Sequence, residues 1–220
     1  MTTNLESIIE RIRADLTHKN EVRDLTLSRS RSLIRFCANS IRATHRHDYD
    51  LARQLLDEAK DAAATMCKEA SAYADIFYAG YLQDALKELA EAAITLALVT
   101  HLDIPDPDDL HIDYAAYLNG LGEAAGEMRR FSLDSIRRGD TEEAERLLGR
   151  MDEIYGYLVT IDFPDSLTRR LRRTTDMVRG VTERTRGDLT TAVRQEELQA
   201  ALQALEGKLE NQASDGPVGD

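Results

Sequence analysis

The chain is predicted to adopt an all-α fold, and three observations lead to that prediction. Alanine and leucine are abundant, whereas only 4 prolines and 12 glycines occur among the 220 residues. Apolar side chains recur at the spacing of helix faces through most of the chain, and no stretch alternates as exposed strands do. The length suffices for one domain with a sizeable core. We therefore expect a single helical domain over residues 1–210 and a disordered tail over 211–220.

Three helices are predicted in the first half of the chain. In the first, Leu33, Phe36 and Ala43 recur at helical spacing and mark its buried side. Asp48 is an N-cap candidate for the second helix, because its side chain can accept a hydrogen bond from a first-turn amide. The third helix follows after a short break. These helices are expected at 4–46, 49–71 and 75–101.

A loop separates these helices from three more. Pro105 and Pro107 fall in segment 101–113, which is the clearest loop in the sequence. Asp140, followed three residues later by Glu143, fits a capping box at the start of the fifth helix. The remaining helices are expected at 113–138, 141–161 and 166–209, the last with a candidate break at 186–188.

Composition points to an acidic protein that does not span a membrane. No stretch approaches ~20 consecutive apolar residues, and the first residues lack the apolar core of a signal peptide. We therefore expect a cytoplasmic location and reduced cysteines at Cys37 and Cys67. The net charge is −12, with 23 Arg against 5 Lys. Such a surface favours hydration in concentrated salt and is typical of a salt-loving archaeal cytoplasm.

Basic side chains are concentrated in two segments. Residues 11–47 hold nine Arg or Lys against three acids, and residues 169–186 hold seven Arg against two acids. Four arginines of the first helix fall within a sector of ~60° and form one cationic stripe. Basic helices on an acidic body are typical of a polyanion site, although arginines that pair with acidic neighbouring helices or subunits explain the pattern equally well. The stripe consists of Arg31, Arg35, Arg42 and Arg46.

Two pairs of glutamates are the main candidates for chemistry. Glu88 and Glu91 lie three residues apart, and Glu123 and Glu127 lie four apart. Each pair therefore shares one face of a predicted helix, where like charges repel. Antiparallel helices joined by a loop would bring the two pairs within reach of each other.

Two interpretations of these pairs remain open. Spacing alone favours acids exposed on the helices of an acidic protein. The alternative is a divalent cation, and a site of carboxylate oxygens suits Mg²⁺ or Mn²⁺. A di-iron bundle is disfavoured, because no Glu-x-x-His occurs at either pair. Gly120, Gly122 and Gly126 accompany the second pair at a cost of ~1 kcal/mol each, which indicates close approach of a backbone or a ligand.

Other residue types add no catalytic pattern. The segment His45–His47, next to Asp48, is a candidate for binding metal or phosphate, but a polar turn at a helix end is the favoured interpretation. No nucleophile with its base and orienting acid can be assembled, and glycine-rich phosphate-binding motifs are absent from the sequence.

The sequence resembles the translin family, and within it the branch of translin-associated factor X (Trax) and the archaeal Trax-like proteins. The similarity covers nearly the whole chain. The order and spacing of the motifs and the placement of glycines agree with the family. The motifs are IRATHRHD (41–48), YAGYLQDALKELAEA (78–92), DYAAYLNGLGEAAGEMRRFSLDSIRRGD (113–140), EIYGYL (153–158) and TERTRGDLTTA (182–192).

The resemblance implies a bundle of about seven helices that assembles into a closed, hollow oligomer, commonly of eight subunits. It also implies that the Trax branch is a metal-dependent endoribonuclease with four carboxylates facing the cavity. The family's Glu-x-x-Glu matches Glu88 and Glu91, and its Asp-x-x-x-Glu matches Glu123 and Glu127. Glu123 therefore stands where the family has an aspartate and carries one more methylene.

These observations lead to one functional prediction and two alternatives. We expect a homo-oligomeric endoribonuclease that binds single-stranded RNA, with DNA as a further candidate ligand, and uses Mg²⁺ or Mn²⁺. The first alternative is a non-catalytic oligomer that binds single-stranded DNA or RNA. The second is a helical scaffold, which predicts that the arginine stripe is buried against acidic helices. The predicted metal ligands and catalytic residues are Glu88, Glu91, Glu123 and Glu127, and the predicted phosphate contacts are Arg31, Arg35, Arg42, Arg46, Arg129 and Arg130.

Overall fold

The all-α prediction is confirmed for residues 4–214, which are the residues that the computed structural model describes. Six long helices and two single-turn helices make up this part of the chain, and no strand occurs in it. The helices are α1 (Asn4–His45), α2 (Tyr49–Ala70), α3 (Ala74–Phe77), α4 (Gly80–Val99), α5 (Tyr114–Arg137), α6 (Thr141–Leu158), α7 (Asp165–Thr168) and α8 (Leu171–Ser214).

The helices differ from the expected ones mainly in four places. The expected third helix is divided into α3 and α4, and the expected last one into α7 and α8. The candidate break at 186–188 is wrong, because α8 continues through it. Leu189 is buried directly after it, and packing there offsets the ~1 kcal/mol cost of Gly187. Residues 211–214, expected in the tail, belong to α8, and 215–220 lie outside the described residues.

Aspartate caps begin three of the long helices. Asp48 accepts a hydrogen bond from the Leu51 amide at 3.3 Å, and Asp140 accepts one from the Glu143 amide at 3.1 Å. Asp113 caps α5 in the same way. Each cap satisfies an amide that the helix itself leaves unpaired. The N-caps predicted at Asp48 and Asp140 are therefore confirmed. The capping box predicted at Asp140 is not, because the Glu143 carboxylate pairs with Arg146 and the Asp140 amide donates to the Ser135 carbonyl oxygen.

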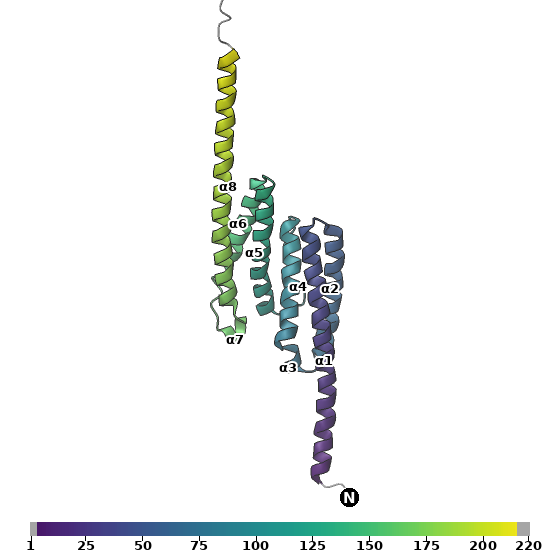
Figure 1. The fold of residues 1–220 in the computed structure, drawn as a ribbon. Coiled ribbons are helices and arrows are strands. Elements are labelled where there is room, and N and C mark those ends of the chain that lie inside the picture. The colour runs from purple at the N-terminus through teal and green to yellow at the C-terminus, as the bar shows by residue number, and fades with distance from the viewer. Residues whose placement is uncertain (1–3, 215–220) are drawn as a thin grey trace, which may run out of the picture.

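The helices form an elongated array rather than a sphere (Figure 1). α1 packs against α2 and α4, α4 packs against α5, and α5 packs against α6 and α8. The N-terminal part of α1 and the C-terminal part of α8 extend beyond the array at opposite ends (Figure 1). No helix within residues 4–214 is long and apolar enough to cross a bilayer. The contact between α4 and α5 at the centre of the array positions the candidate site.

Candidate metal centre and nucleic-acid interface

Three of the four predicted glutamates converge between α4 and α5. One carboxylate oxygen from each of Glu88, Glu91 and Glu123 lies within 4.8 Å of the other two. All three side chains are half-buried. Glu123 thus reaches the α4 pair, so the extra methylene that distinguishes it from the family's aspartate is accommodated. We call these three residues the carboxylate cluster.

Close packing of α4 on α5 brings the cluster together. A Cβ atom at Gly120 would lie 2.6 Å from the Lys87 carbonyl oxygen and 2.7 Å from Ala90 Cβ, which real structures do not tolerate. Gly122 contacts Thr174 of α8 in a similarly close manner, whereas a Cβ at Gly126 would meet nothing within 4 Å. The expected role of these glycines in close approach is confirmed at Gly120 and Gly122, where the approaching group belongs to a neighbouring helix.

Burial and mutual repulsion characterise the cluster. Burial raises the pKa of Glu91 to about 8, with further contributions from the charges of Glu88, Glu123 and Glu127. Lys87 opposes this rise. Its Nζ atom lies 2.5 Å from Glu123 Oε2 and 3.3 Å from Glu88 Oε1. One ammonium group therefore only partly neutralises three converging carboxyl groups.

Glu127 does not belong to the cluster and contacts a histidine that was not among the predicted site residues. Its Oε2 atom forms an ion pair and hydrogen bond with His45 Nε2. The His45 side chain is only 5% exposed and stacks on Phe131 at a centroid distance of 4.1 Å. His45 Nδ1 has no hydrogen-bond partner among the described residues. Since His45 and Glu127 are 82 residues apart, no local sequence signal could reveal their contact.

The donor set fits a hard divalent cation. Mg²⁺ and Mn²⁺ prefer oxygen ligands and are commonly bound by a few carboxylates together with water. The cluster supplies three such groups from two rigid helices, and their repulsion is only partly neutralised by Lys87. A doubly charged ion would relieve that repulsion. No histidine or cysteine belongs to the group within the described chain.

The arginine stripe of α1 is free for contact with an anion. All four of its side chains are exposed, and none forms an ion pair within residues 4–214. Arg35 and Arg42 donate only to the neutral side chains of Ser32 and Asn39. Burial of the stripe against acidic helices, as a scaffold would require, is therefore contradicted for this chain by itself.

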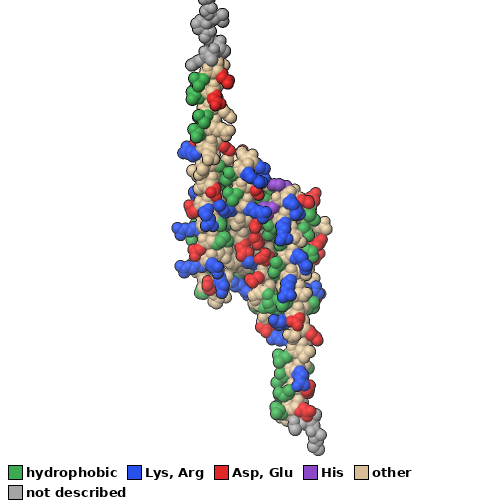
Figure 2. All heavy atoms as spheres, viewed as in Figure 1, with side chains coloured by type: hydrophobic (Ala, Val, Ile, Leu, Met, Phe, Trp, Pro, Cys, Tyr) green, Lys and Arg blue, Asp and Glu red, His purple; other side chains and the backbone are tan. Residues whose placement is uncertain are grey.

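The two other predicted phosphate contacts differ from each other. Arg129 is half-buried and lies 2.9 Å from Asp188 of α8, and it also donates to Thr185. It is thus occupied within the chain. Arg130, the next residue, is exposed and has no ion pair among the described residues. Figure 2 shows acidic side chains gathered over the centre of the array, with basic side chains on both sides of them.

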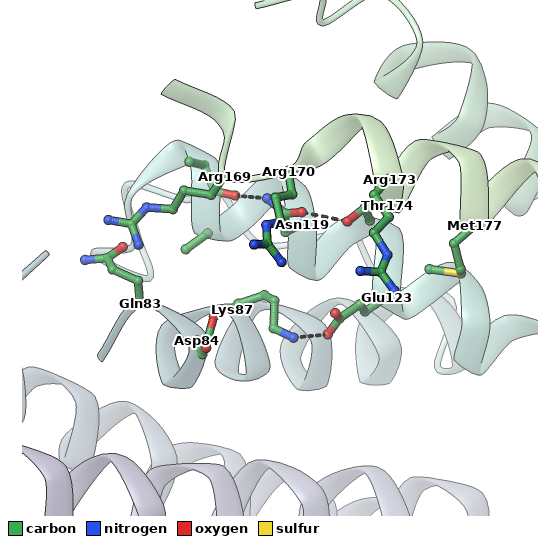
Figure 3. A pocket seen from close by; sticks show the side chains of 12 residues that line it. Gln83, Asp84, Lys87, Asn119, Glu123, Arg169, Arg170, Arg173, Thr174 and Met177 are labelled. Atoms are coloured by element: carbon green, nitrogen blue, oxygen red, sulfur yellow. Dashed lines mark hydrogen bonds and ion pairs between the residues drawn. The ribbon is translucent and has the colours of Figure 1, made fainter. Parts of the chain in front are cut away.

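Three further arginines lie close to the cluster and were not among the predicted site residues. Arg169, Arg170 and Arg173 line a cavity of about 360 Å³ together with Lys87 and Glu123 (Figure 3). The excess of arginine in segment 169–186 was the available sequence signal, but it did not show which of the seven arginines face the carboxylates.

Solved structures resemble this fold closely. AfC3PO, solved with and without duplex RNA, is 32% identical and matches with a TM-score of 0.78 over 84% of this chain; the match covers 95% of the chain in the RNA complex. Apo-NeC3PO matches with a TM-score of 0.77 at 24% identity, over 87% of this chain and 98% of that one. The two comparisons agree on an all-α C3PO fold, and C3PO is a complex of translin and Trax proteins. The chain belongs to the translin family.

One curated protein resembles the chain and indicates neither a family nor a function. The uncharacterized protein MJ0175 of Methanocaldococcus jannaschii is 29% identical over 192 residues, which cover 87% of this chain and 85% of the relative. No protein-family model matches the chain. Family membership therefore depends on the C3PO structures, and the chain extends over nearly the full length of each.

Proposed function

We propose that this translin-family protein is a metal-dependent endoribonuclease of the Trax branch that binds and cleaves single-stranded RNA. The observation that carries the proposal is the convergence of Glu88, Glu91 and Glu123 in a half-buried position. The resemblance to Trax assigns metal ligands to these same positions. The similarity to a C3PO that binds duplex RNA supports RNA as the ligand class.

The three clustered glutamates would hold Mg²⁺ or Mn²⁺, and Glu127 completes the acidic set from the next turn of α5. When bound, the metal lowers the pKa of a water molecule and offsets negative charge on the phosphate that is cut. His45 holds the Glu127 carboxylate through Nε2, and the stacked Phe131 ring keeps the imidazole in place. The α1 arginine stripe binds backbone phosphates, which gives affinity without sequence preference.

Assembly into a closed, hollow homo-oligomer is part of the same proposal, with eight subunits as the family resemblance implies. The two projecting helix ends carry exposed apolar side chains spaced four and three residues apart, the pattern of a helix-pairing seam. These side chains are between 44% and 66% exposed in the single chain. They are Leu5, Ile9, Ile12 and Leu16 on α1, and Leu198, Leu202, Leu205 and Leu209 on α8.

Metal-dependent cleavage tests the proposal. A labelled single-stranded RNA is incubated with the protein and Mn²⁺, with and without a chelator, beside the same strand as DNA and as duplex RNA. We expect cleavage of the single-stranded RNA that stops with chelator and is lost in Glu88→Ala. Glu58→Gln, at an exposed position of α2, is the matched control and should cleave like the wild type. Full activity in Glu88→Ala would refute the assignment.

A non-catalytic oligomer that binds single-stranded nucleic acid is the second candidate. One observation favours it: Glu127, the fourth carboxylate of the family's set, pairs with His45 and does not join the other three. This candidate predicts that RNA is retarded in a gel but stays intact with Mn²⁺. The cleavage assay therefore separates the two functions.

A further inference from the structure

The cavity next to the carboxylate cluster has an unusual concentration of positive charge. Its lining includes Arg169, Arg170, Arg173 and Lys87, against the two acids Asp84 and Glu123. In Figure 3, the side chains of Arg170 and Arg173 point across the cavity towards Lys87 and Glu123. A cavity with excess positive charge is notable in a chain with a net charge of −12.

The three cavity arginines form no ion pair within the described residues, although carboxylates are plentiful. Arg129 of α5 and Arg186 of α8 are paired, with Asp188 and Asp152, whereas exposed arginines of the same helices such as Arg172 form no ion pair among the described residues. Arg169 donates one hydrogen bond, to the Tyr78 carbonyl oxygen at 3.2 Å. Most of the guanidinium donors in the cavity therefore remain available, and guanidinium groups suit phosphate oxygens in charge and geometry.

A buried hydrogen-bond network fixes the segment that carries these arginines. The Asn119 amide donates to the Thr168 carbonyl oxygen at 3.0 Å, directly before Arg169. The Asn119 side-chain oxygen accepts from Thr174 at 2.7 Å, directly after Arg173. Asn119 of α5 thus binds the residues at both ends of segment 169–173. The cavity arginines keep a defined position relative to Glu123, which lies one turn further along α5.

The turn between α7 and α8 places the consecutive residues Arg169 and Arg170 at the cavity. Arg169 and Arg170 adopt left-handed backbone conformations, with φ of 51° and 68°. Such conformations cost non-glycine residues about 1–2 kcal/mol each. The 44-residue helix α8 begins at the next residue, and its N-terminal end adds a partial positive charge beside the same cavity.

We propose that this cavity binds a phosphate group of the RNA strand, held by Arg170 and Arg173 with Arg169 and Lys87 beside them. The bound phosphate is a neighbour of the one at the carboxylate cluster, so the cavity sets the position of the strand relative to the site of cleavage. The proposal deepens the proposed ribonuclease function and depends on it for that last step. The phosphate is either an internal diester or the terminal group of a strand.

The experiment compares two double variants that each remove two positive charges from residues 170–179, at the start of α8. Arg170→Gln with Arg173→Gln removes the cavity arginines, whereas Arg172→Gln with Arg179→Gln removes two exposed arginines that do not line it. Binding of labelled single-stranded RNA is measured without divalent metal by fluorescence anisotropy over a salt series. Mn²⁺ binding is measured by calorimetry, and KM and kcat for RNA cleavage are measured with Mn²⁺.

We expect the cavity variant to bind RNA about tenfold more weakly. In a plot of log K against the logarithm of the salt concentration, its slope should be shallower by about 0.7 for each lost phosphate contact. Its KM should rise about tenfold, while kcat and Mn²⁺ affinity stay within about threefold of wild type. The control variant should stay within about twofold in all four quantities. Equal losses in the two variants, or no loss in the cavity variant, would overturn the proposal.

Two further measurements complete the experiment. One identifies the source of the phosphate, and the other tests whether the cavity arginines have only a structural role. A difference between wild type and cavity variant that appears only for RNA with a 5′-phosphate assigns a terminal phosphate, and a difference also for 5′-hydroxyl RNA assigns an internal one. Arg170→Gly relieves the left-handed strain while it deletes the guanidinium, so it should keep the thermal stability and still weaken RNA binding. Unchanged RNA binding in Arg170→Gly would argue against the site.

The binding arm also separates this proposal from the ribonuclease function. If the wild type leaves RNA uncut with Mn²⁺, the ribonuclease function fails, and the metal-free affinities still decide whether the cavity holds a phosphate. If the wild type cleaves RNA and both double variants bind equally well, the cavity proposal fails and the ribonuclease function stands.

Discussion

The two basic regions of the chain carry similar charge but present it differently. On α1, four exposed arginines follow one helix face and leave an open surface. At the start of α8, three arginines line a cavity that also contains Glu123. Two other arginines of α8, Arg186 and Arg194, form ion pairs within the chain, with Asp152 and Glu197. Net charge of a segment therefore identifies a basic region, but only packing decides which of its arginines can meet a ligand.

The largest expected effect concerns the carboxylate cluster, one member of which, Glu123, lines the cavity of the second basic region. The pKa of Glu91 is raised to about 8, whereas an unfolded chain releases this proton near pH 4.5. Between these values the folded protein holds a proton that the unfolded chain lacks. The free energy of unfolding of the metal-free protein should thus fall as pH rises from about 4.5 to 8, by at most about 1.4 kcal/mol for each pH unit.

Urea unfolding at a series of pH values checks this expectation, with Glu91→Gln as the comparison. The glutamine has no proton to lose, so its stability should depend less on pH across the same window. Saturating Mn²⁺ should also restore stability at pH 8, because it stabilises the ionised carboxylates. Parallel pH profiles for wild type and Glu91→Gln would show that the cluster is less strained than its geometry indicates.

Removing the α1 stripe should give the next largest effect. With Arg31, Arg35, Arg42 and Arg46 all changed to Gln, single-stranded RNA should bind on the order of a hundredfold more weakly at low salt, and to a similar degree for different sequences. Anisotropy titrations over a salt series measure this. If affinity is unchanged while the cavity variant loses it, the α8 cavity is the principal phosphate site and the comparison above must be revised.

The contact between α4 and α5 should respond to a single methyl group. Gly120→Ala forces a Cβ against the α4 backbone, so it should destabilise the protein by about 1–2 kcal/mol and weaken Mn²⁺ binding. Gly126→Ala lies on the same helix and meets no neighbour, so it should be neutral or stabilise by up to about 1 kcal/mol. Thermal unfolding and calorimetry compare the two, and equal effects would contradict the packing described.

The smallest effect is expected for an arginine that is already paired. Arg186→Gln breaks an exposed pair with Asp152 and should cost about 0–1 kcal/mol in the free energy of unfolding. RNA affinity should remain within about twofold of the wild type, because this guanidinium is engaged within the chain. A loss as large as that of the cavity variant would show that ion pairing inside the chain does not decide which arginines bind RNA.

Sequence patterns predicted the parts of the molecule that depend on short-range physics. The long helices, the caps at Asp48 and Asp140, and the close approach at Gly120 all follow from spacing and residue type. Spacing alone did not decide whether Glu88, Glu91 and Glu123 converge. Their convergence also requires that the two helices pack in the correct register. The family resemblance pointed to the same residues.

Two features could not be predicted, for different physical reasons. The contact of His45 with Glu127 joins residues 82 positions apart, so only the tertiary fold creates it. The turn at Arg169 and Arg170 adopts a conformation for which glycine or asparagine is the usual signal. Arginine at both positions gave no such signal, and the helix was therefore expected to begin at 166.

The position of Lys87 affects which ions can bind at the carboxylate cluster. Its ammonium group already occupies a place between Glu88 and Glu123, so an arriving cation competes with a resident single positive charge. Sodium or potassium replaces that charge with an equal one and gains little electrostatic energy, whereas a divalent ion adds a further charge. For a cluster that binds a cation as proposed, the lysine would therefore favour a divalent ion over a monovalent one.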